Sequence, residues 1–484
     1  MGIKQTLIAY EEVGAAYFER RGLRRYARVW SLWALGVGAV ISGCFFGWNF
    51  GLDAGGFGGL LIATGIITVM YLGLCFCIAE MSPALPHTGG AYSFGRSAMG
   101  PSGGFITGLG ETMEYVLTPA VIVVGIGGYL GAVFGTPEVY DPLWWLAMYV
   151  LFVGLNLVGV ETSFRFTVAI TLLALAILLV FYVGALPHFS WETALNIAPD
   201  SGQNRFLPKG WMGIGAALPF AIWFYLAIEE LPLAAEEAHD PKRDMPKGLL
   251  LGLLTLVATA FLTLFLNSGI EPGAQSVGVS DEPLFLGFQT IFGDGMGTKL
   301  LALIAVAGLI ASFHTIIFAY GRNIYSLSRA GYFPRFLSLT HRRRKTPYMG
   351  LIAGAVIGYC VALLIHFLPQ ESPVGAVLLN MAVFGALISY LMQLLAFIFL
   401  RIRLPQIARP YVSPLGVPGA VIAIVICAVA LLFLFLNPEY NKGVLGAAVW
   451  YFLGLVYFFA YARTRLVKAP EEAFAEEARA RQEA

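Results

Sequence analysis

Long apolar segments recur along almost the whole sequence, and they constrain the fold more than any other feature. About 20 apolar residues in a helix cross the core of a bilayer. Only 12% of the residues are charged, about half the usual share, so lipid must cover much of the surface. We therefore expect an all-α integral membrane protein. Twelve transmembrane helices are predicted at 31–52, 57–79, 104–134, 142–160, 164–186, 211–233, 247–268, 298–320, 349–367, 374–400, 414–436 and 444–462.

Lysine and arginine residues fall almost entirely on one side of these predicted helices. Of the 30, only four lie in segments assigned to the other side: Arg205, Lys209, Lys299 and Lys442. Basic residues collect in the cytoplasmic segments of membrane proteins. The distribution therefore predicts a multi-pass protein of the inner (cytoplasmic) membrane, with a cytoplasmic N-terminal arm (1–28) and a cytoplasmic C-terminal tail (464–484). Basic runs also attract anionic headgroups, so membrane lipid is an expected partner.

Glycines cluster in the first predicted helix, around the segment Gly38–Phe46. A transmembrane helix must satisfy its own backbone polar groups, because lipid offers no partners. A glycine cluster relaxes this rule, since it lets the chain unwind or lets helices pack closely. We expect unwinding around a solute site, and close helix packing is the alternative.

The sixth predicted helix carries two prolines, which bracket an aromatic triplet and a carboxylate pair. Proline removes a backbone donor and clashes with the preceding turn. Adjacent carboxylates at membrane depth are costly unless they line a polar cavity or pair. We therefore expect a second interrupted helix, although the two glutamates could instead cap a helix at the cytoplasmic interface. The residues concerned are Pro219, Trp223, Phe224, Tyr225, Glu229, Glu230 and Pro232.

Interrupted helices in corresponding positions of two halves are typical of inverted-repeat transporters. The first and sixth predicted helices are five apart, so we expect two five-helix repeats. The repeats are 29–186 and 211–403, separated by an extracytoplasmic loop at 187–210 and followed by two extra helices within 404–463.

Four stretches of the sequence resemble motifs of the amino acid–polyamine–organocation (APC) superfamily of permeases: 38–46, 79–92, 236–246 and, more weakly, 320–334. The run Ser42–Gly59 is similar to the ethanolamine permease branch. The resemblance implies a LeuT-like fold with broken helices 1 and 6. It also implies a secondary active transporter that imports a small amine, with ethanolamine as the first candidate, by alternating access. An amino acid or polyamine permease or antiporter of the same superfamily is the alternative.

Two departures from the superfamily pattern bear on the substrate and its coupling. Amino acid permeases usually place Gly-Ser-Gly or Gly-Thr-Gly where this chain has Ser42-Gly43-Cys44. The two flanking side chains would crowd backbone amides that bind a carboxylate, and ethanolamine has no carboxylate. Some proton-coupled members carry a lysine midway along helix 5, whereas the helix at 164–186 has none.

The resemblance and the expected interruptions together assign the candidate site. Backbone carbonyls and aromatic faces suit an ammonium group, and the substrate-binding set is Ile41, Ser42, Gly43, Glu111, Tyr115, Thr118, Trp223, Phe224, Tyr225, Ala227 and His314. Carboxylates inside a span are functional by default, and the gate or coupling set is Glu111, Glu114, Glu229 and Glu230. The alternatives are packing aromatics, a structural polar contact for Glu111, and a His314 satisfied by a neighbouring helix. The loops at 83–90 and 242–247 are expected to be inner-gate elements.

The expected partners are a small organic amine and either a coupling ion, for which a proton is one candidate, or a counter-substrate. The net charge is only +1, so no nucleic-acid partner is expected. The five cysteines lack ligand spacing, and the sequence contains no nucleophile–base or metal constellation. We therefore expect no enzyme activity, no cofactor and no metal. A channel would need a continuous polar pore, whereas the polar residues of the spans cluster at mid-depth.

Overall fold

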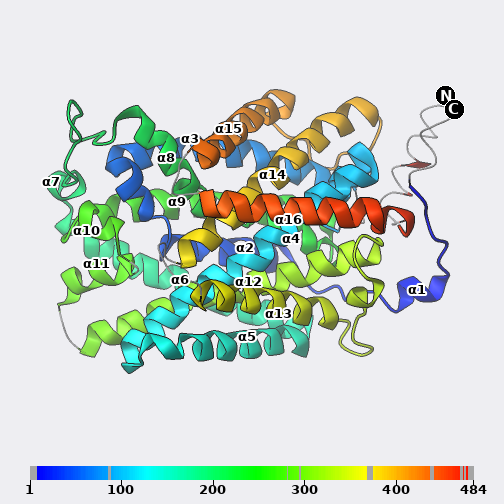
Figure 1. The fold of residues 1–484 in the computed structure, drawn as a ribbon, viewed down its shortest axis with the longest axis horizontal. Helices are drawn as coiled ribbons and strands as arrows, with labels where there is room; N and C mark the ends of the chain where they lie inside the picture. The colour runs from blue at the N-terminus through cyan, green and yellow to red at the C-terminus, as the bar shows by residue number, and fades with distance from the viewer. Residues whose placement is uncertain are drawn as a thin grey trace.

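The computed structural model describes residues 8–85, 89–280, 282–293, 296–367, 374–436 and 441–468, together with 473 and 476–477. Within this part of the chain the elements are helices, and they lie side by side along the long axis of the molecule (Figure 1). The middle of the predicted gate loop 83–90 and most of the C-terminal tail lie outside the described residues.

Ten long helices form the body of the bundle. They are α3 (Phe50–Ala84), α4 (Ala91–Phe134), α5 (Asp141–Val158), α6 (Val160–Ala185), α9 (Pro241–Ser268), α12 (Met296–Arg329), α13 (Tyr348–Phe367), α14 (Val374–Arg403), α15 (Gly416–Leu436) and α16 (Asn441–Ala460). A helix satisfies most of its backbone polar groups internally, as a segment in lipid must, and at the kink in α3 the N–H of Gly58 donates to the carbonyl of Phe206 instead.

Shorter helices complete the bundle and its two ends. The α-helices are α1 (Ala15–Glu19), α2 (Val29–Val40), α7 (Trp191–Ala194), α8 (Gly210–Trp223), α10 (Ala274–Gly278) and α11 (Pro283–Phe292). The 3-10 helices are η1 (Ile41–Cys44), η2 (Glu138–Tyr140), η3 (Leu186–His188), η4 (Ile228–Glu237), η5 (Arg335–Ser338) and η7 (Ala462–Thr464).

Nine helical segments of the described chain are long and apolar enough to cross a membrane. Two shorter apolar helices, Val29–Cys44 and Tyr348–Leu364, and the 34-residue α12 coincide with the three remaining predicted spans. The protein is therefore an all-helical, multi-pass membrane protein, and the count of twelve spans stays a prediction.

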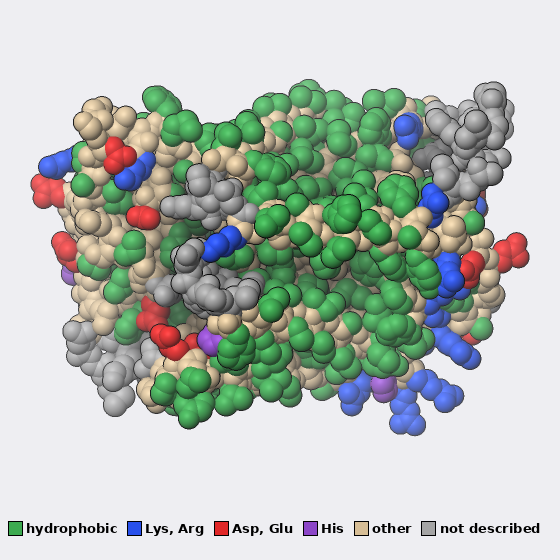
Figure 2. All heavy atoms as spheres, in the orientation of Figure 1, with side chains coloured by type: hydrophobic (Ala, Val, Ile, Leu, Met, Phe, Trp, Pro, Cys, Tyr) green, Lys and Arg blue, Asp and Glu red, His purple; other side chains and the backbone are tan. Residues whose placement is uncertain are grey.

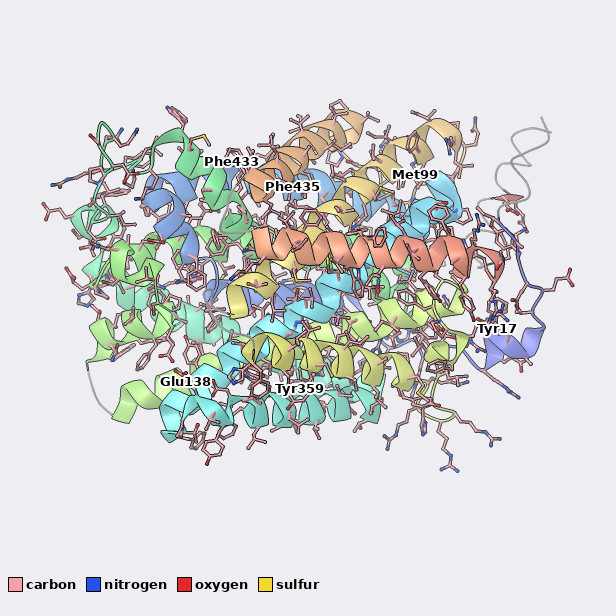
Figure 3. The ribbon with its side chains drawn as sticks, viewed as in Figure 1. Tyr17, Met99, Glu138, Tyr359, Phe433 and Phe435 are labelled. Atoms are coloured by element: carbon pink, nitrogen blue, oxygen red, sulfur yellow. The ribbon has the colours of Figure 1, made fainter. Side chains whose placement is uncertain are left out.

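The surface has the character of a membrane protein. Hydrophobic side chains cover the middle of the molecule, and charged side chains gather toward its two ends (Figure 2). Lysine and arginine side chains concentrate at the end where α1 and its Tyr17 lie, whereas Glu138 lies at the other end (Figures 2 and 3). This is the end that the distribution of basic residues predicts to face the cytoplasm.

The boundary between the first two predicted helices coincides with a kink. The element α3 runs from Phe50 to Ala84, but two helices meet within it at Gly56, inside the predicted gap at 53–56. The chain bends inside α3 at Gly56, whose φ of 72° is a left-handed conformation that suits glycine. Pro208 packs there so closely that a Cβ at Gly56 would lie 2.2 Å from its ring.

The predicted loop at 242–247 is also corrected, because these residues form the first turns of α9. Pro241 occupies the first position of that helix, where its missing N–H would have no helical partner anyway. If this segment takes part in an inner gate, it does so as a helix.

A buried ion pair joins η4 to α12 at the basic end of the bundle. The Arg322 guanidinium donates to both carboxylate oxygens of Glu237, at 2.9 and 3.2 Å. The two side chains are 1% and 0% exposed. The backbone carbonyl of Glu237 also accepts the N–H groups of Tyr26 and Ala27, at 2.7 and 2.9 Å. The chain that enters α2 is therefore fixed to the ends of η4 and α12.

The N-terminal arm and the segment after η7 also pack at this basic end of the bundle. The N–H of Glu11 donates to the carbonyl of Leu466 at 2.7 Å, and the Tyr17 hydroxyl donates to the carbonyl of Arg329 at 2.8 Å. Burial raises the pKa of Tyr17 above its ordinary value, so the hydroxyl remains a donor at neutral pH. Arg329 in turn pairs with Glu236, next to the buried Arg322–Glu237 pair.

Removing the negative partner of the buried pair should destabilise the fold. Glu237→Gln leaves Arg322 buried without its counter-charge, which typically costs about 3–5 kcal/mol. Glu161→Gln is the matched control, because its i,i+4 pair with Arg165 is exposed and should contribute less than about 1 kcal/mol. Thermal unfolding in detergent should show a clearly lower Tm for Glu237→Gln only. Equal Tm values for the two variants would contradict a structural role for the pair.

Candidate substrate-binding site

The first interruption lies between α2 and α3. The α-helix ends at Val40, continues as η1, and resumes as an α-helix only at Phe50. Side chains supply the hydrogen bonds that the helix loses here. The Ser312 hydroxyl accepts the N–H of Ser42 at 2.9 Å, and Asn49 Oδ1 accepts the N–H of Gly47 at 3.1 Å. An unwound segment at membrane depth requires such partners.

The second interruption lies between α8 and η4. The α-helix ends at Trp223, and the chain resumes as a 3-10 helix at Ile228. Ala227 has a φ of 82°, a left-handed conformation that costs an L-residue about 1–2 kcal/mol. The prolines flank this break rather than occupy it, because Pro219 lies inside α8 and Pro232 inside η4.

The two interruptions meet. A Cβ at Gly43 would lie 2.3 Å from the carbonyl oxygen of Trp223, and a Cβ at Gly47 would lie 2.6 Å from Trp223 Nε1. The ring of Trp48 stacks on Phe224 with a centroid distance of 5.4 Å. Glycine is therefore required at 43 and 47 because the other break passes directly over them. The neighbouring predicted residues, Ile41 and Ser42, are buried at the same break.

Two indole groups at this junction have no hydrogen-bond partner. The Nε1 atoms of Trp48 and Trp223 are buried, and neither finds an acceptor in the described part of the chain. A buried unpaired donor costs about 1–3 kcal/mol, and such groups mark sites of strain, chemistry or binding. Both N–H groups can donate to an oxygen of a small molecule held between the breaks.

The aromatic triplet of the sixth helix is divided among different neighbours. Trp223 lies against Gly47, whereas Tyr225 contacts residues of α3. The Tyr225 hydroxyl lies 2.7 Å from Thr68 Oγ1, and its ring lies 5.1 Å from that of Tyr71. The contacts of Tyr225 are thus with α3, and they do not place it among the groups that line the junction.

Glu111 fastens two helices together. It accepts the backbone N–H groups of Ala91 and Tyr92, both at 3.2 Å, and the side-chain amide of Asn323 at 3.3 Å. α4 folds back on itself at Gly100, so its first residues return to Glu111. These contacts are the structural alternative that the sequence left open. Tyr115 lies beside Glu111, with its hydroxyl 3.5 Å from a carboxylate oxygen.

Three further carboxyl groups gather between η4 and α4. Glu114 of α4 approaches Glu229, which is adjacent in sequence to Glu230, and the Tyr390 hydroxyl donates to Glu114 at 3.4 Å. All three glutamates are at most 1% exposed. Within the described chain, the carboxylate oxygens of Glu230 have no hydrogen-bond partner, whereas Glu229 lies within reach of Glu114 and Tyr390. A buried carboxylate without a partner is costly, so this group can take up a proton. Thr118 lies one turn further along α4, with its hydroxyl bonded to the carbonyl of Glu114.

The assignment of His314 to the substrate is corrected. Its Nδ1 lies 3.1 Å from Asn156 Nδ2 on α5, and its Nε2 lies 3.1 Å from Ser163 Oγ on α6. Both ring nitrogens are therefore bonded to neighbouring helices. Ser312, two residues earlier on α12, faces the first interruption instead, because successive helical residues are about 100° apart.

Sequence reasoning missed several polar and aromatic residues of the junction. Their signal was weak, since a single serine or tryptophan in a span is common in packed helices. The missed residues are Trp48, Asn49, Ser312 and Tyr390. In the described part of the chain, no group of three or more His, Cys, Asp or Glu residues is arranged to hold a metal ion.

The chain has relatives among transporters over nearly its full length. An uncharacterized transporter of Rhizobium meliloti is 28% identical, covering 91% of this chain and 92% of that protein. A branched-chain amino acid permease of Bacillus subtilis is 27% identical, covering 94% and 96%. A methylthioribose transporter of the same bacterium is 25% identical, covering 93% and 96%.

A family model describes most of the same region. The amino acid permease model matches residues 28–461, which include both interrupted helices and all the candidate site residues. The APC resemblance read from the sequence motifs is thereby confirmed at the level of the family. The chain belongs to the amino acid permease family.

Proposed function

We propose that this protein is a secondary active transporter that imports a small organic amine across the cytoplasmic membrane by alternating access. The observation that carries the proposal is the contact between the two interruptions, where Gly43 lies against the backbone of Trp223. Unwound backbone at membrane depth is tolerated only where it is buried in protein or lines a cavity. Paired half-helices of this kind form the binding sites of secondary transporters.

The residues at the junction suit an amine that also carries an oxygen. Carbonyl groups near the breaks and the faces of Trp48 and Trp223 can hold the ammonium group, because an aromatic face attracts a desolvated cation by about 0.5–2 kcal/mol. The two unpaired indole N–H groups can donate to the oxygen. The carboxyl groups of Glu114 on α4 and Glu229 on η4 approach each other, and they can bind a coupling ion such as a proton.

The wider arrangement is part of the same proposal. The breaks lie in the first and sixth of twelve spans, which belong to repeats at 29–186 and 211–403, with two extra helices at 404–463 and both termini in the cytoplasm. At the basic end of the bundle, the N–H groups of Tyr26 and Ala27 donate to the carbonyl of Glu237. Opening the site to the cytoplasm would require the chain entering α2 to leave the ends of η4 and α12.

Amino acids are the substrate class that the family favours. One relative is named for branched-chain amino acids, and two plant relatives from Arabidopsis thaliana are named for cationic amino acids. The family is not confined to this class, since another relative is named for methylthioribose.

A carboxylate-free amine such as ethanolamine is the second candidate, because one amide of the first break is already occupied. The N–H of Ser42 is bonded to Ser312, and the side chains of Ser42 and Cys44 flank Gly43. Fewer free amides therefore remain for a substrate carboxylate than an all-glycine segment would offer.

A ligand screen tests the proposal and separates the two substrate classes. A substrate that binds the folded protein should raise its Tm, because saturation at 100 times Kd stabilises by about 2.7 kcal/mol. We expect a shift with at least one small amine among ethanolamine, leucine, arginine and putrescine, and saturable uptake of that amine into proteoliposomes. A shift confined to ethanolamine would select the second candidate. The absence of both shift and uptake for all four compounds would contradict the proposal.

Trp223→Ala should abolish this uptake without loss of folded protein. The substitution removes both an aromatic face and a buried donor from the junction, so we expect uptake at substrate concentrations below KM to fall by about tenfold or more. Trp145→Ala is the matched control, since Trp145 is equally buried but packs on α4 and α13, against Gly127 and His366. Equal transport losses in two equally folded variants would argue against a site at Trp223.

A further inference from the structure

The hydroxyl of Ser312 is inserted into the hydrogen-bond ladder of the first helix. In an α-helix the N–H of residue 42 donates to the carbonyl of residue 38. Here the N–H of Ser42 donates to Ser312 Oγ at 2.9 Å, and Ser312 Oγ donates to the carbonyl of Gly38 at 2.8 Å. One hydroxyl from α12 thus replaces one backbone hydrogen bond of the interrupted helix. Insertion of a side chain into the ladder is a recognised cause of a sharp bend.

The neighbours of Ser312 hold its hydroxyl in this position. His314, on the opposite face of α12, is bonded to both Asn156 and Ser163, and these bonds favour the observed rotation of α12 about its axis. Ser312 itself is fully buried, so its hydroxyl is shielded from bulk water.

The close approach of α12 depends on a glycine in the first helix. A Cβ at Gly38 would lie 2.6 Å from Thr171 Oγ1 and 3.2 Å from Thr315 Cγ2. Unlike the hydroxyl of Ser312, the hydroxyl of Thr315 donates within its own helix, to the carbonyls of Ala311 and Ser312. Of these two hydroxyl groups of α12, only that of Ser312 is therefore inserted into the first helix, and the packing around Gly38 brings it within reach.

We propose that Ser312 is a positioning residue that keeps the first helix open between Gly38 and Ser42, and thereby sets the location of Gly43 and Gly47 relative to Trp223. The inference deepens the proposed function and rests on it for its kinetic consequences. Without the hydroxyl, Ser42 can donate directly to Gly38, and the helix can continue further toward Gly43. The segment that faces Trp223 would then move. The same bond also withdraws the Ser42 amide from the substrate.

The kinetic test compares Ser312→Ala with Thr315→Val in proteoliposomes, using the amine that the wild-type protein transports. We expect Ser312→Ala to raise KM by about tenfold with kcat changed by less than about threefold, because substrate contacts are misplaced while the moving helices are intact. Thr315→Val keeps the methyl group near Gly38 and should leave both constants unchanged. Ser312→Thr retains the hydroxyl and should restore KM, whereas Ser312→Cys, of similar size but a weak hydrogen-bonder, should follow alanine.

A second measurement is independent of transport. Hydrogen–deuterium exchange of the peptide covering 38–46 should slow in Ser312→Ala, because direct helical hydrogen bonds protect its amides, and should be unchanged in Thr315→Val. Unchanged exchange together with unchanged KM in Ser312→Ala would overturn the inference. If the wild-type protein transports no amine, the proposed function fails, and the exchange measurement alone then decides whether Ser312 holds the helix open.

Discussion

The constraint on which this structure depends is the hydrogen bonding of the backbone in lipid. A helix that crosses a membrane can be interrupted only where the protein replaces the bonds that it loses. The first helix meets this requirement with side chains, since Ser312 of α12 bonds both Gly38 and Ser42 and the nearby Asn49 bonds Gly47. Asn49 also donates to the carbonyls of Val277 and Ser280. The break is therefore held by contacts to α12 and to the segment around α10.

Sequence patterns located both interruptions but not their details. Glycine frees the backbone and proline removes a helical donor, so Gly43, Gly47 and Pro219 indicated where two helices could be broken. The rotation of a helix about its axis is set by packing against several neighbours, which one sequence does not specify. For this reason His314 was chosen over Ser312, although the two residues face opposite sides of α12.

For the four glutamates of the site, the sequence pattern shows their positions in the spans, whereas packing determines their partners. Glutamates within apolar spans are conspicuous, and all four are buried. Their roles differ because their partners differ. Glu111 accepts three N–H donors from α4 and α12, and these bonds fasten helices together. Glu229 approaches the carboxyl group of Glu114, and the carboxylate oxygens of Glu230 have no partner within the described chain. A buried carboxylate without a partner is costly unless it takes up a proton.

The second helix interruption and two of the carboxyl groups lie next to each other in the segment from Trp223 to Glu230. The segment from Trp223 to Glu230 presents an indole to the first break on one side and carboxyl groups to α4 on the other. Ala227, with its left-handed backbone, lies between them. Only a few residues separate Trp223 at the end of α8 from Glu229 in η4. If the proposed function holds, coupling between an ion at Glu229 and a substrate at Trp223 needs no long pathway through the protein, because a shift in the backbone around Ala227 would connect them.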